Sequence, residues 1–325
     1  EVILHMIDKS SSAKKGFDPS TAYDYKQLIS KFVMGAVFYN QAVDNYMDEK
    51  LSAKKKPNDK GYKKGKHYTG KEHSWDEAFG YFGAAAHGLT LSAKQNYEIA
   101  KLGKKSKSSE AALKLADYNG DGVVDLYREM NFAHAYYASA YDKKGKTSYY
   151  KDIVQGFIDG RKLITSAEGE KLSNEQRSKL REIAADIESN WEKVIAESVF
   201  KYAGSVYKDL EKLNIIMDSN GNIDKAFRKY GKHWGELKGF SMALQAGRKN
   251  LGEVAVKMNR MIGYGPLLPN GSQVVDVDAN GDFIKDQGKS MGGYMLHMLK
   301  IQKLMVQEFG VKAHANDKLA SIKGL

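Results

Sequence analysis

The sequence of 325 residues contains no cysteine and only four prolines. Without cysteine, the chain cannot form disulfides, thiolate nucleophiles or metal sites with sulfur ligands. The few prolines leave few enforced breaks, and Ala, Leu, Lys and Glu recur with the three-and-four spacing of amphipathic helices. A hydrophobic content of 42% can supply a substantial core. We therefore expect an all-α protein.

Long apolar runs are also absent. No uninterrupted run reaches the roughly 18 residues needed to cross a bilayer, so we do not expect a membrane-spanning protein. The first residues lack the basic, apolar and small-residue order of a secretory signal peptide. Because the chain starts with Glu1 rather than Met, we interpret it as a processed or truncated mature form.

Arginine is scarce, although the net charge is +11. The positive charge comes from 44 lysines and seven arginines, and planar bidentate recognition of phosphate is mainly the work of arginine. We expect no sequence-specific nucleic-acid binding, while diffuse attraction to anionic polymers or surface components stays open. Seven lysines fall within residues 54–66; a flexible linker is the favoured interpretation, and a contact surface for an acidic partner is the alternative.

The helical pattern predicts an N-terminal extension over residues 1–20 and then a helix to Leu51, with its N-cap at Ser20 or Thr21. The short apolar run Gln273–Val275 is the single strand candidate. Further helices, some of them short or broken, are predicted over residues 74–88, 126–143, 147–166, 173–213, 223–230, 234–261 and 290–309.

The two halves of the sequence resemble each other. Residues 36–51 align without gaps on residues 198–213, with identical Val, Phe, Glu, Lys and Leu at matching positions. A second block follows each of them in the same order: Trp75, Glu77, Gly80 and Tyr81 correspond to Trp234, Glu236, Gly239 and Phe240. We infer a duplicated helical bundle, with one repeat over residues 21–170 and the other over 171–325.

Residues 117–129 have the spacing of an EF-hand calcium loop. Oxygen side chains stand at loop positions 1, 3, 5 and 9, with glycine at position 6 for the sharp turn and an apolar residue at position 8 as an anchor. Arg128 replaces the usual Glu at position 12, and Glu129 follows it. The alternative is an Asn-Gly and Asp-Gly turn without metal. The candidate calcium ligands are Asp117, Asn119, Asp121, the backbone carbonyl of Val123, Asp125 and Glu129.

A second segment has Asp276, Asp278 and Asn280 at positions 1, 3 and 5, glycine at position 6 and an apolar residue at position 8, with Asp282 as a further candidate ligand, but Gln287 stands at position 12. We predict calcium here as well. A third segment, residues 218–224, has no glycine at position 6, and a helix start capped by Asn222 is the favoured account of it. Imperfect loops bind calcium in the weak range of extracellular modules, about 10⁻⁴ to 10⁻³ M, which millimolar calcium outside the cytoplasm would fill. We therefore expect an extracytoplasmic protein of the periplasm or cell surface, or a secreted one.

Two Trp-Glu segments suggest a family. Glu72–Gly83 and Lys232–Phe240 resemble the His-Trp-Asp-Glu-Ala-Phe-Gly-Tyr-Phe-Gly and His-Trp-x-Glu-Leu-Lys-Gly-Phe motifs of an uncharacterised bacterial lipoprotein family, a domain of unknown function. The resemblance covers roughly residues 20–250. That family is similar in layout to imelysin-like proteins, which are periplasmic or surface proteins linked to iron uptake and use a His-x-x-Glu pair. The resemblance implies an imelysin-like bundle and a link to iron.

The same segments place histidine and glutamate on one helix face. His73 precedes Glu77 by four residues and His233 precedes Glu236 by three, so each pair could offer imidazole and carboxylate to iron or another transition metal. If the duplication brings the pairs together, they form a site of four ligands. The alternative is that each pair is a hydrogen-bonded clamp between packed helices, with Trp75 and Trp234 in the core.

Signals for an enzyme are weak. Gly288–Gly292 fits the Gly-x-Ser-x-Gly formula, but that motif needs a preceding strand in a parallel sheet. No phosphate-binding glycine loop or His-Glu-x-x-His motif occurs, and we interpret His134 as a core histidine. We expect an extracytoplasmic calcium-binding protein that is not an enzyme and binds a metal or small ligand between its halves. The alternative is a structural or adhesive surface or matrix protein stiffened by calcium.

Overall fold

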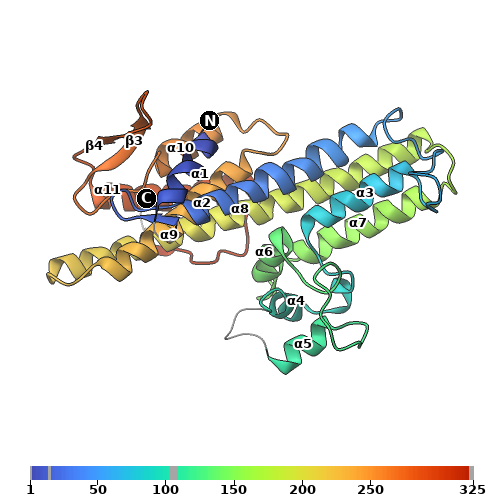
Figure 1. The fold of residues 1–325 in the computed structure, drawn as a ribbon, viewed down its shortest axis with the longest axis horizontal. Helices are drawn as coiled ribbons and strands as arrows, with labels where there is room; N and C mark the ends of the chain where they lie inside the picture. Colours follow the sequence, from blue (N-terminus) through green and yellow to red (C-terminus); the bar gives the residue numbers. More distant parts are fainter. Residues whose placement is uncertain (1, 14–15, 103–108, 322–325) are drawn as a thin grey trace. The chain divides into compact units, whose positions relative to one another are not determined.

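The computed structural model describes residues 2–13, 16–102 and 109–321. Within these ranges the chain is mostly helical, as predicted, with eleven α-helices and two pairs of short strands (Figure 1). The helices are α1 (Val2–Ser12), α2 (Tyr25–Val33), α3 (Gly70–Phe82), α4 (Ala93–Ile99), α5 (Glu110–Ala116), α6 (Ala133–Asp142), α7 (Tyr149–Thr165), α8 (Asn174–Asp218), α9 (Asp224–Leu244), α10 (Gly252–Ile262) and α11 (Met291–Phe309).

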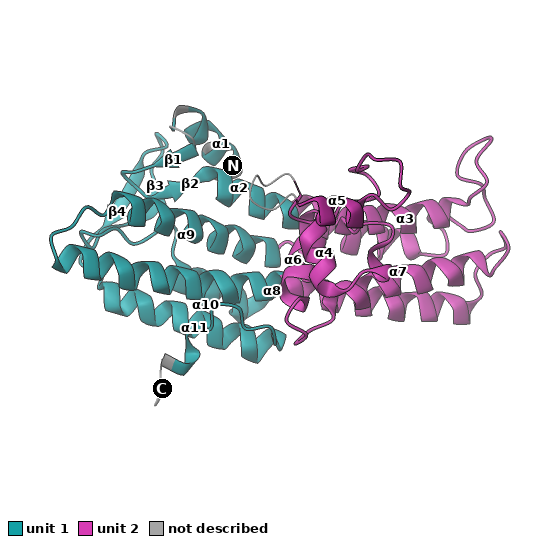
Figure 2. Cartoon of the chain, turned by 90° about the horizontal axis from the view of Figure 1, so that it is seen from below, with its two compact units in different colours: residues 1–35, 195–245, 249–325 teal, residues 36–194, 246–248 magenta. Residues whose placement is uncertain are grey.

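Two compact units divide the described chain, and they do not follow its order (Figure 2). Unit 1 comprises residues 1–35, 195–245 and 249–325, and unit 2 comprises residues 36–194 and 246–248. Helix α8 contributes to both, because the division falls between Val194 and Ile195. These units are defined by contacts in space, whereas the predicted repeats are defined by sequence, so the repeats stay a prediction.

In unit 1, α2 lies along α9 and α10 lies along α11 (Figure 1). Gly35 lets the first pair approach closely, since a Cβ there would lie 2.3 Å from the Cα of Ala243. Trp234 is fully buried on α9 and donates its indole N–H to the Tyr294 hydroxyl at 2.8 Å. The core of this unit is therefore built around an aromatic side chain with a satisfied polar group.

In unit 2, α3 packs on α7 and α4 packs on α6. Thr69 and Glu72 form a capping box at the start of α3, which satisfies two otherwise unpaired N–H groups. Trp75 is fully buried and donates to the backbone carbonyl of Phe157 on α7 at 2.7 Å. Gly83 ends the helix in the left-handed conformation at φ 84°.

The helices predicted near residues 147–166, 173–213 and 290–309 are confirmed as α7, α8 and α11. The helix predicted over residues 234–261 is in fact two, because α9 ends at Leu244 and α10 begins at Gly252. The helix predicted from Leu126 starts only at Ala133, since the Tyr127 N–H donates to the Asp125 side chain and the Phe132 N–H donates to the carbonyl of Gly83.

The N-terminal predictions need correction. Residues 1–20 contain helix α1, whose Met6 is buried and which packs on α2. The N-cap of α2 is Asp24 rather than Ser20 or Thr21, because Phe17–Asp18 (β1) pairs with Tyr23–Asp24 (β2) and delays the helix.

The helix predicted to reach Leu51 is regular only to Val33. It continues as π-helical turns over Met34–Tyr39 and Gln41–Tyr46, and a 3₁₀ turn over Glu49–Leu51 ends it. The wider turns begin next to Gly35, where the chain passes Ala243, consistent with the insertion of π-turns where packing forces a helix to widen.

The predicted strand at Gln273 is confirmed and is longer than predicted. Strand β3 (Gln273–Val277) pairs antiparallel with β4 (Phe283–Asp286), with an irregularity between Val274 and Asp276. This hairpin contains the second predicted calcium segment.

Candidate functional site

The first predicted calcium loop lies between α5 and α6 and is folded by its own oxygens. The Asp117 carboxylate accepts the N–H groups of Gly120 and Gly122, each at 2.9 Å. Asn119 and Asp121 each accept the N–H two residues ahead. These side chains are exposed or half-buried, so a series of side-chain turns gathers oxygens along one short stretch of backbone.

Glu129 closes the loop from behind. One of its carboxylate oxygens accepts the N–H groups of Tyr118 and Asn119 at 2.9 and 3.2 Å, and the other accepts that of Asp125 at 2.8 Å. Its residue is only 4% exposed. The bond from the Asp125 N–H, with those from Asn119 and Tyr118, lowers the pKa of Glu129. Glu129 thus acts here as a clamp on the loop backbone.

Val124, at the apolar position 8, anchors the loop. It packs against a buried cluster formed by Ala85, Ile99 and Ala116. Among the described residues, one ion pair lies within the loop and joins the exposed Arg128 to Asp125 at 3.8 Å. The loop is therefore fixed at its apolar position and at Glu129, while most of its acidic groups face solvent without a neutralising partner among the described residues.

The second predicted segment is the turn of the β3–β4 hairpin. Asp276 lies within β3 opposite Ile284, and Val277 pairs with Phe283. The Asp278 carboxylate accepts the N–H groups of Asn280 and Asp282 at 2.8 and 2.9 Å. In this segment the acidic residues therefore stabilise the turn of a β-hairpin.

The third segment leads into α9, as favoured from the sequence, but the N-cap residue is Ile223, which makes no side-chain cap bond, rather than Asn222. Asn222 accepts the N–H of Asp224 at 2.8 Å, directly before α9. Asn220 adopts the left-handed conformation at φ 53°, which asparagine tolerates better than most residues.

The first His-Glu pair lies on α3 in unit 2. His73 Nε2 is 3.3 Å from Glu77 Oε1, which agrees with the predicted i, i+4 geometry. The imidazole ring also lies against Tyr62 and Tyr68, with ring centroids 3.6 and 5.7 Å apart. Both side chains of the pair are partly exposed.

The second pair lies on α9 in unit 1, and both of its members bond to α8. His233 Nδ1 is 2.5 Å from the carboxylate of Asp209, and Glu236 accepts the Tyr202 hydroxyl at 3.1 Å. Asp209 and Glu236 are both buried. Sequence reasoning missed Asp209, although a signal existed: it interrupts the buried apolar stripe of Val206, Leu210 and Leu213.

The pairs occupy different units, and each has local partners. Within residues 2–13, 16–102 and 109–321, no three His, Asp or Glu side chains are grouped so as to hold a metal ion. No helix in that part of the chain is both long and apolar enough to span a membrane.

His134 is a core residue of unit 2. It is fully buried on α6 with its ring against Trp191, at a centroid distance of 5.5 Å. Neither ring nitrogen has a hydrogen-bond partner among the described residues. Burial lowers the pKa of His134 from 6.5 to about 3, so the ring is neutral at physiological pH.

Comparison with models of known families identifies the family of this chain. Its residues 10–251 match the family described as a domain of unknown function, DUF4856, and because this is most of the chain, the protein belongs to that family. The match includes both His-Glu pairs and the first calcium segment, and it ends before the β3–β4 hairpin. Searches of curated proteins and of solved structures gave no match.

Proposed function

We propose that this protein is an extracytoplasmic calcium-binding helical protein, with its principal site in the loop from Asp117 to Asp125. The supporting observation is the combination of alternating oxygen side chains that face solvent and an apolar position 8, Val124, that packs into a buried cluster. That combination supplies part of what a calcium loop requires.

The donor set fits a hard cation. Asp117, Asn119, Asp121 and Asp125 supply only oxygen, and Val123 adds a backbone carbonyl at position 7. An ionised carboxylate has about four lone-pair sites, so bonds to two N–H groups leave Asp117 with the capacity to bind calcium. A bound ion would stiffen the loop and neutralise its acidic groups.

The missing acidic ligand at position 12 favours weak binding and therefore a calcium-rich compartment. Glu129 is engaged with three backbone N–H groups, so we place the affinity in the range of about 10⁻⁴ to 10⁻³ M that extracellular modules show. The family resemblance to lipoproteins and imelysin-like proteins supports the same placement.

Thermal melting with calcium tests the proposal. At a calcium concentration ten to a hundred times the Kd, we expect a stabilisation of about 1.4 to 2.7 kcal/mol, reversed by a chelator. Asp117→Asn keeps an acceptor for the loop N–H groups but removes the charge, and it should abolish most of that gain. Asp186→Asn, on the exposed surface of α8, is the matched control and should respond like the parent. Equal stabilisation of parent and Asp117→Asn would refute the site.

A second candidate function is binding of iron or another transition metal at His233. The ring nitrogen Nδ1 bonded to buried Asp209 is the observation in its favour, because a carboxylate on one nitrogen commonly orients a histidine whose other nitrogen binds a metal. Glu236 has a buried carboxylate oxygen without a hydrogen-bond partner among the described residues. Elemental analysis of protein purified without chelator should find the metal, and His233→Ala should lose it.

A structural or adhesive role is the third candidate. Large apolar side chains within and directly after the calcium loop are exposed, among them Val123 at 66% and Tyr127 at 94%. Exposed apolar groups gathered on one loop favour contact with another macromolecule. Filaments or sheets formed on calcium addition, and lost in Tyr127→Ser, would favour this role over the binding of a small ligand.

A further inference from the structure

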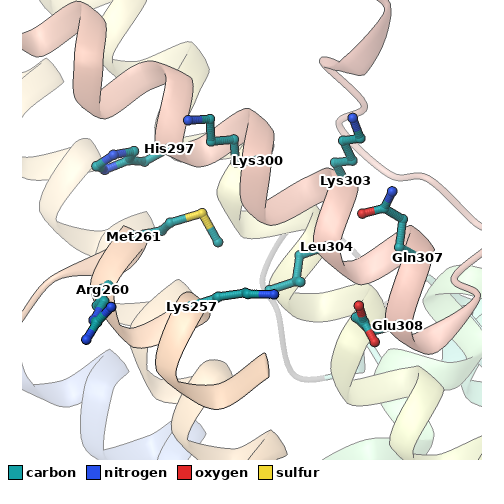
Figure 3. Close-up of a pocket in the computed structure, with 9 residues that line it drawn as sticks. All are labelled: Lys257, Arg260, Met261, His297, Lys300, Lys303, Leu304, Gln307 and Glu308. Atoms are coloured by element: carbon teal, nitrogen blue, oxygen red, sulfur yellow. The ribbon is translucent and has the colours of Figure 1, made fainter. Parts of the chain in front are cut away.

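A cleft of about 420 Å³ lies between α10 and α11 in unit 1 (Figure 3). It falls outside the family match, which ends at residue 251, and it uses none of the residues discussed above. Its volume is that of a small-molecule site. Six of the residues that line it define its character: Lys257, Arg260, Met261, Lys300, Lys303 and Leu304.

Positive charge dominates the cleft. Lys257 and Arg260 come from α10, and Lys300 and Lys303 come from α11. None of these four forms an ion pair within the described part of the chain, unlike Lys318, which lies 2.8 Å from Glu211. Four positively charged side chains thus line one cleft, and their summed positive potential favours an anion there.

The interior of the cleft is apolar. Met261 points into the space between the helices, and Leu304 faces it from α11 (Figure 3). Leu304 is buried at its base. Lys257 extends its ammonium group along the cleft toward Leu304 (Figure 3), so that its aliphatic stem adds to the apolar surface. At one end stands Glu308, the one acidic residue of the lining.

We propose that this cleft binds a small amphipathic anion, with a phosphate or carboxylate group attracted by the positive charges that line the cleft and an apolar chain against Met261 and Leu304. A purely polar anion would leave the apolar floor uncovered, and a neutral chain would leave the cations unpaired. Glu308 disfavours a second anionic group at its end of the cleft, so the ligand carries its charge at one end.

His297 provides an internal reporter. It is half-buried in the lining and its ring donates a hydrogen bond to the Met261 backbone. Burial lowers the pKa of His297, and the charges of Lys300 and Lys289 lower it further. The other titratable group beside the ring is Tyr294. An anion bound near Lys300 would offset that positive field and raise the pKa of His297.

The test is calorimetric titration of the full chain with three probes: n-octyl phosphate, inorganic phosphate and n-octyl glucoside. We expect octyl phosphate to bind about tenfold or more tightly than either other probe, since burying two or three methylenes is sufficient for that factor. Lys257→Gln combined with Lys300→Gln should weaken octyl phosphate binding about tenfold. The control is Lys212→Gln with Lys225→Gln, two exposed lysines on α8 and α9 that give the same change in net charge.

The proposal stands if octyl phosphate is preferred, if only the cleft variant loses affinity, and if the histidine signal of His297 in NMR titrates at higher pH with the ligand. Equal binding of inorganic phosphate would overturn it, as would an equal loss in the control variant. Sedimentation with vesicles containing phosphatidylglycerol, without any binding of free octyl phosphate, would overturn it in favour of a membrane surface. Circular dichroism melts of both variants show whether they are folded.

Discussion

The segments 117–129 and 276–287 share one acidic pattern and fold differently. In the first, Asp117, Asn119 and Asp121 lie on an irregular loop between helices. In the second, Asp276 is part of a strand, and Asp278 organises a hairpin turn. The alternating oxygens therefore specify a tight turn in both segments. The residues around each turn determine whether it forms part of an irregular loop or of a β-hairpin.

Two residues outside the alternation make the difference. Glu129 clamps three N–H groups of the first loop, while Gln287 at the end of the second is exposed. Val124 packs into a buried cluster, whereas Val277 and Phe283 pair as strand neighbours. The first segment therefore has a closing carboxylate and an apolar anchor, and the second has a ladder of backbone bonds.

A histidine-bearing helix follows each segment. After the first comes α6 with His134, which is fully buried; after the second comes α11 with His297, which is half-buried. Burial lowers the pKa of both rings, but only His134 lacks any hydrogen bond in the described residues. The two helices should therefore respond differently to acid.

Acid titration of His134→Phe should show the largest effect. The folded-state pKa of about 3 lies below the unfolded value of 6.5, so the unfolded chain takes up a proton that the folded chain does not. The neutral, buried state of His134 therefore costs no stability well above pH 6.5. As the pH falls from 6.5 toward 3, the free energy of unfolding decreases by up to about 5 kcal/mol. Between about pH 7 and pH 5, the parent should lose about 2 kcal/mol more than His134→Phe in urea unfolding.

Two further variants check this interpretation. His67→Gln removes an exposed histidine and should retain the acid response of the parent. His134→Leu guards against a packing effect specific to phenylalanine. If both His134 variants lose stability on acidification as steeply as the parent, then His134 is not the group that titrates.

Much of the helical layout could be predicted from the sequence, because long amphipathic repeats are a local signal. Helices α7, α8 and α11 fall where the pattern placed them. The π-turns after Val33 could not be predicted, since their cause lies in the approach of Gly35 to Ala243, about two hundred residues away in the chain. Helix α1 was missed because its single described buried side chain, Met6, is too weak a pattern.

The candidate sites show the same limit. Helical spacing correctly placed His73 beside Glu77, a contact within one helix. The partner of His233 is Asp209 from another helix, and spacing along one helix cannot reveal such a partner. The cleft between α10 and α11 could not be predicted either. In the sequence, Lys257 and Lys300 look like ordinary surface lysines, and only the packing of α10 on α11 brings them to one cleft.

Glu129→Ala should produce the next largest effect on stability, and it tests whether the two segments differ in how they are held. Removing the carboxylate leaves the N–H groups of Tyr118, Asn119 and Asp125 without their acceptor, so we expect the melting temperature to fall by several degrees. Gln287→Ala, at position 12 of the second segment, should leave it unchanged because the side chain is exposed. Differential scanning calorimetry measures both, and similar melting temperatures for the two variants would contradict the role of Glu129 as a clamp.

Val124→Ala should produce the smallest effect on stability, and it tests whether the apolar anchor of the first loop contributes to calcium binding. Truncating a partly buried valine costs about 1 kcal/mol, measurable by urea unfolding, and Ile284→Ala in the exposed part of β4 is the matched control, with a cost of about 0.5 kcal/mol or less. Because Val124 holds the loop against Ala85, Ile99 and Ala116, its truncation should also weaken calcium binding several-fold, whereas Ile284→Ala should not. An unchanged calcium affinity in Val124→Ala would mean that the oxygens alone organise the first loop, and the contrast between the two segments would then rest on Glu129.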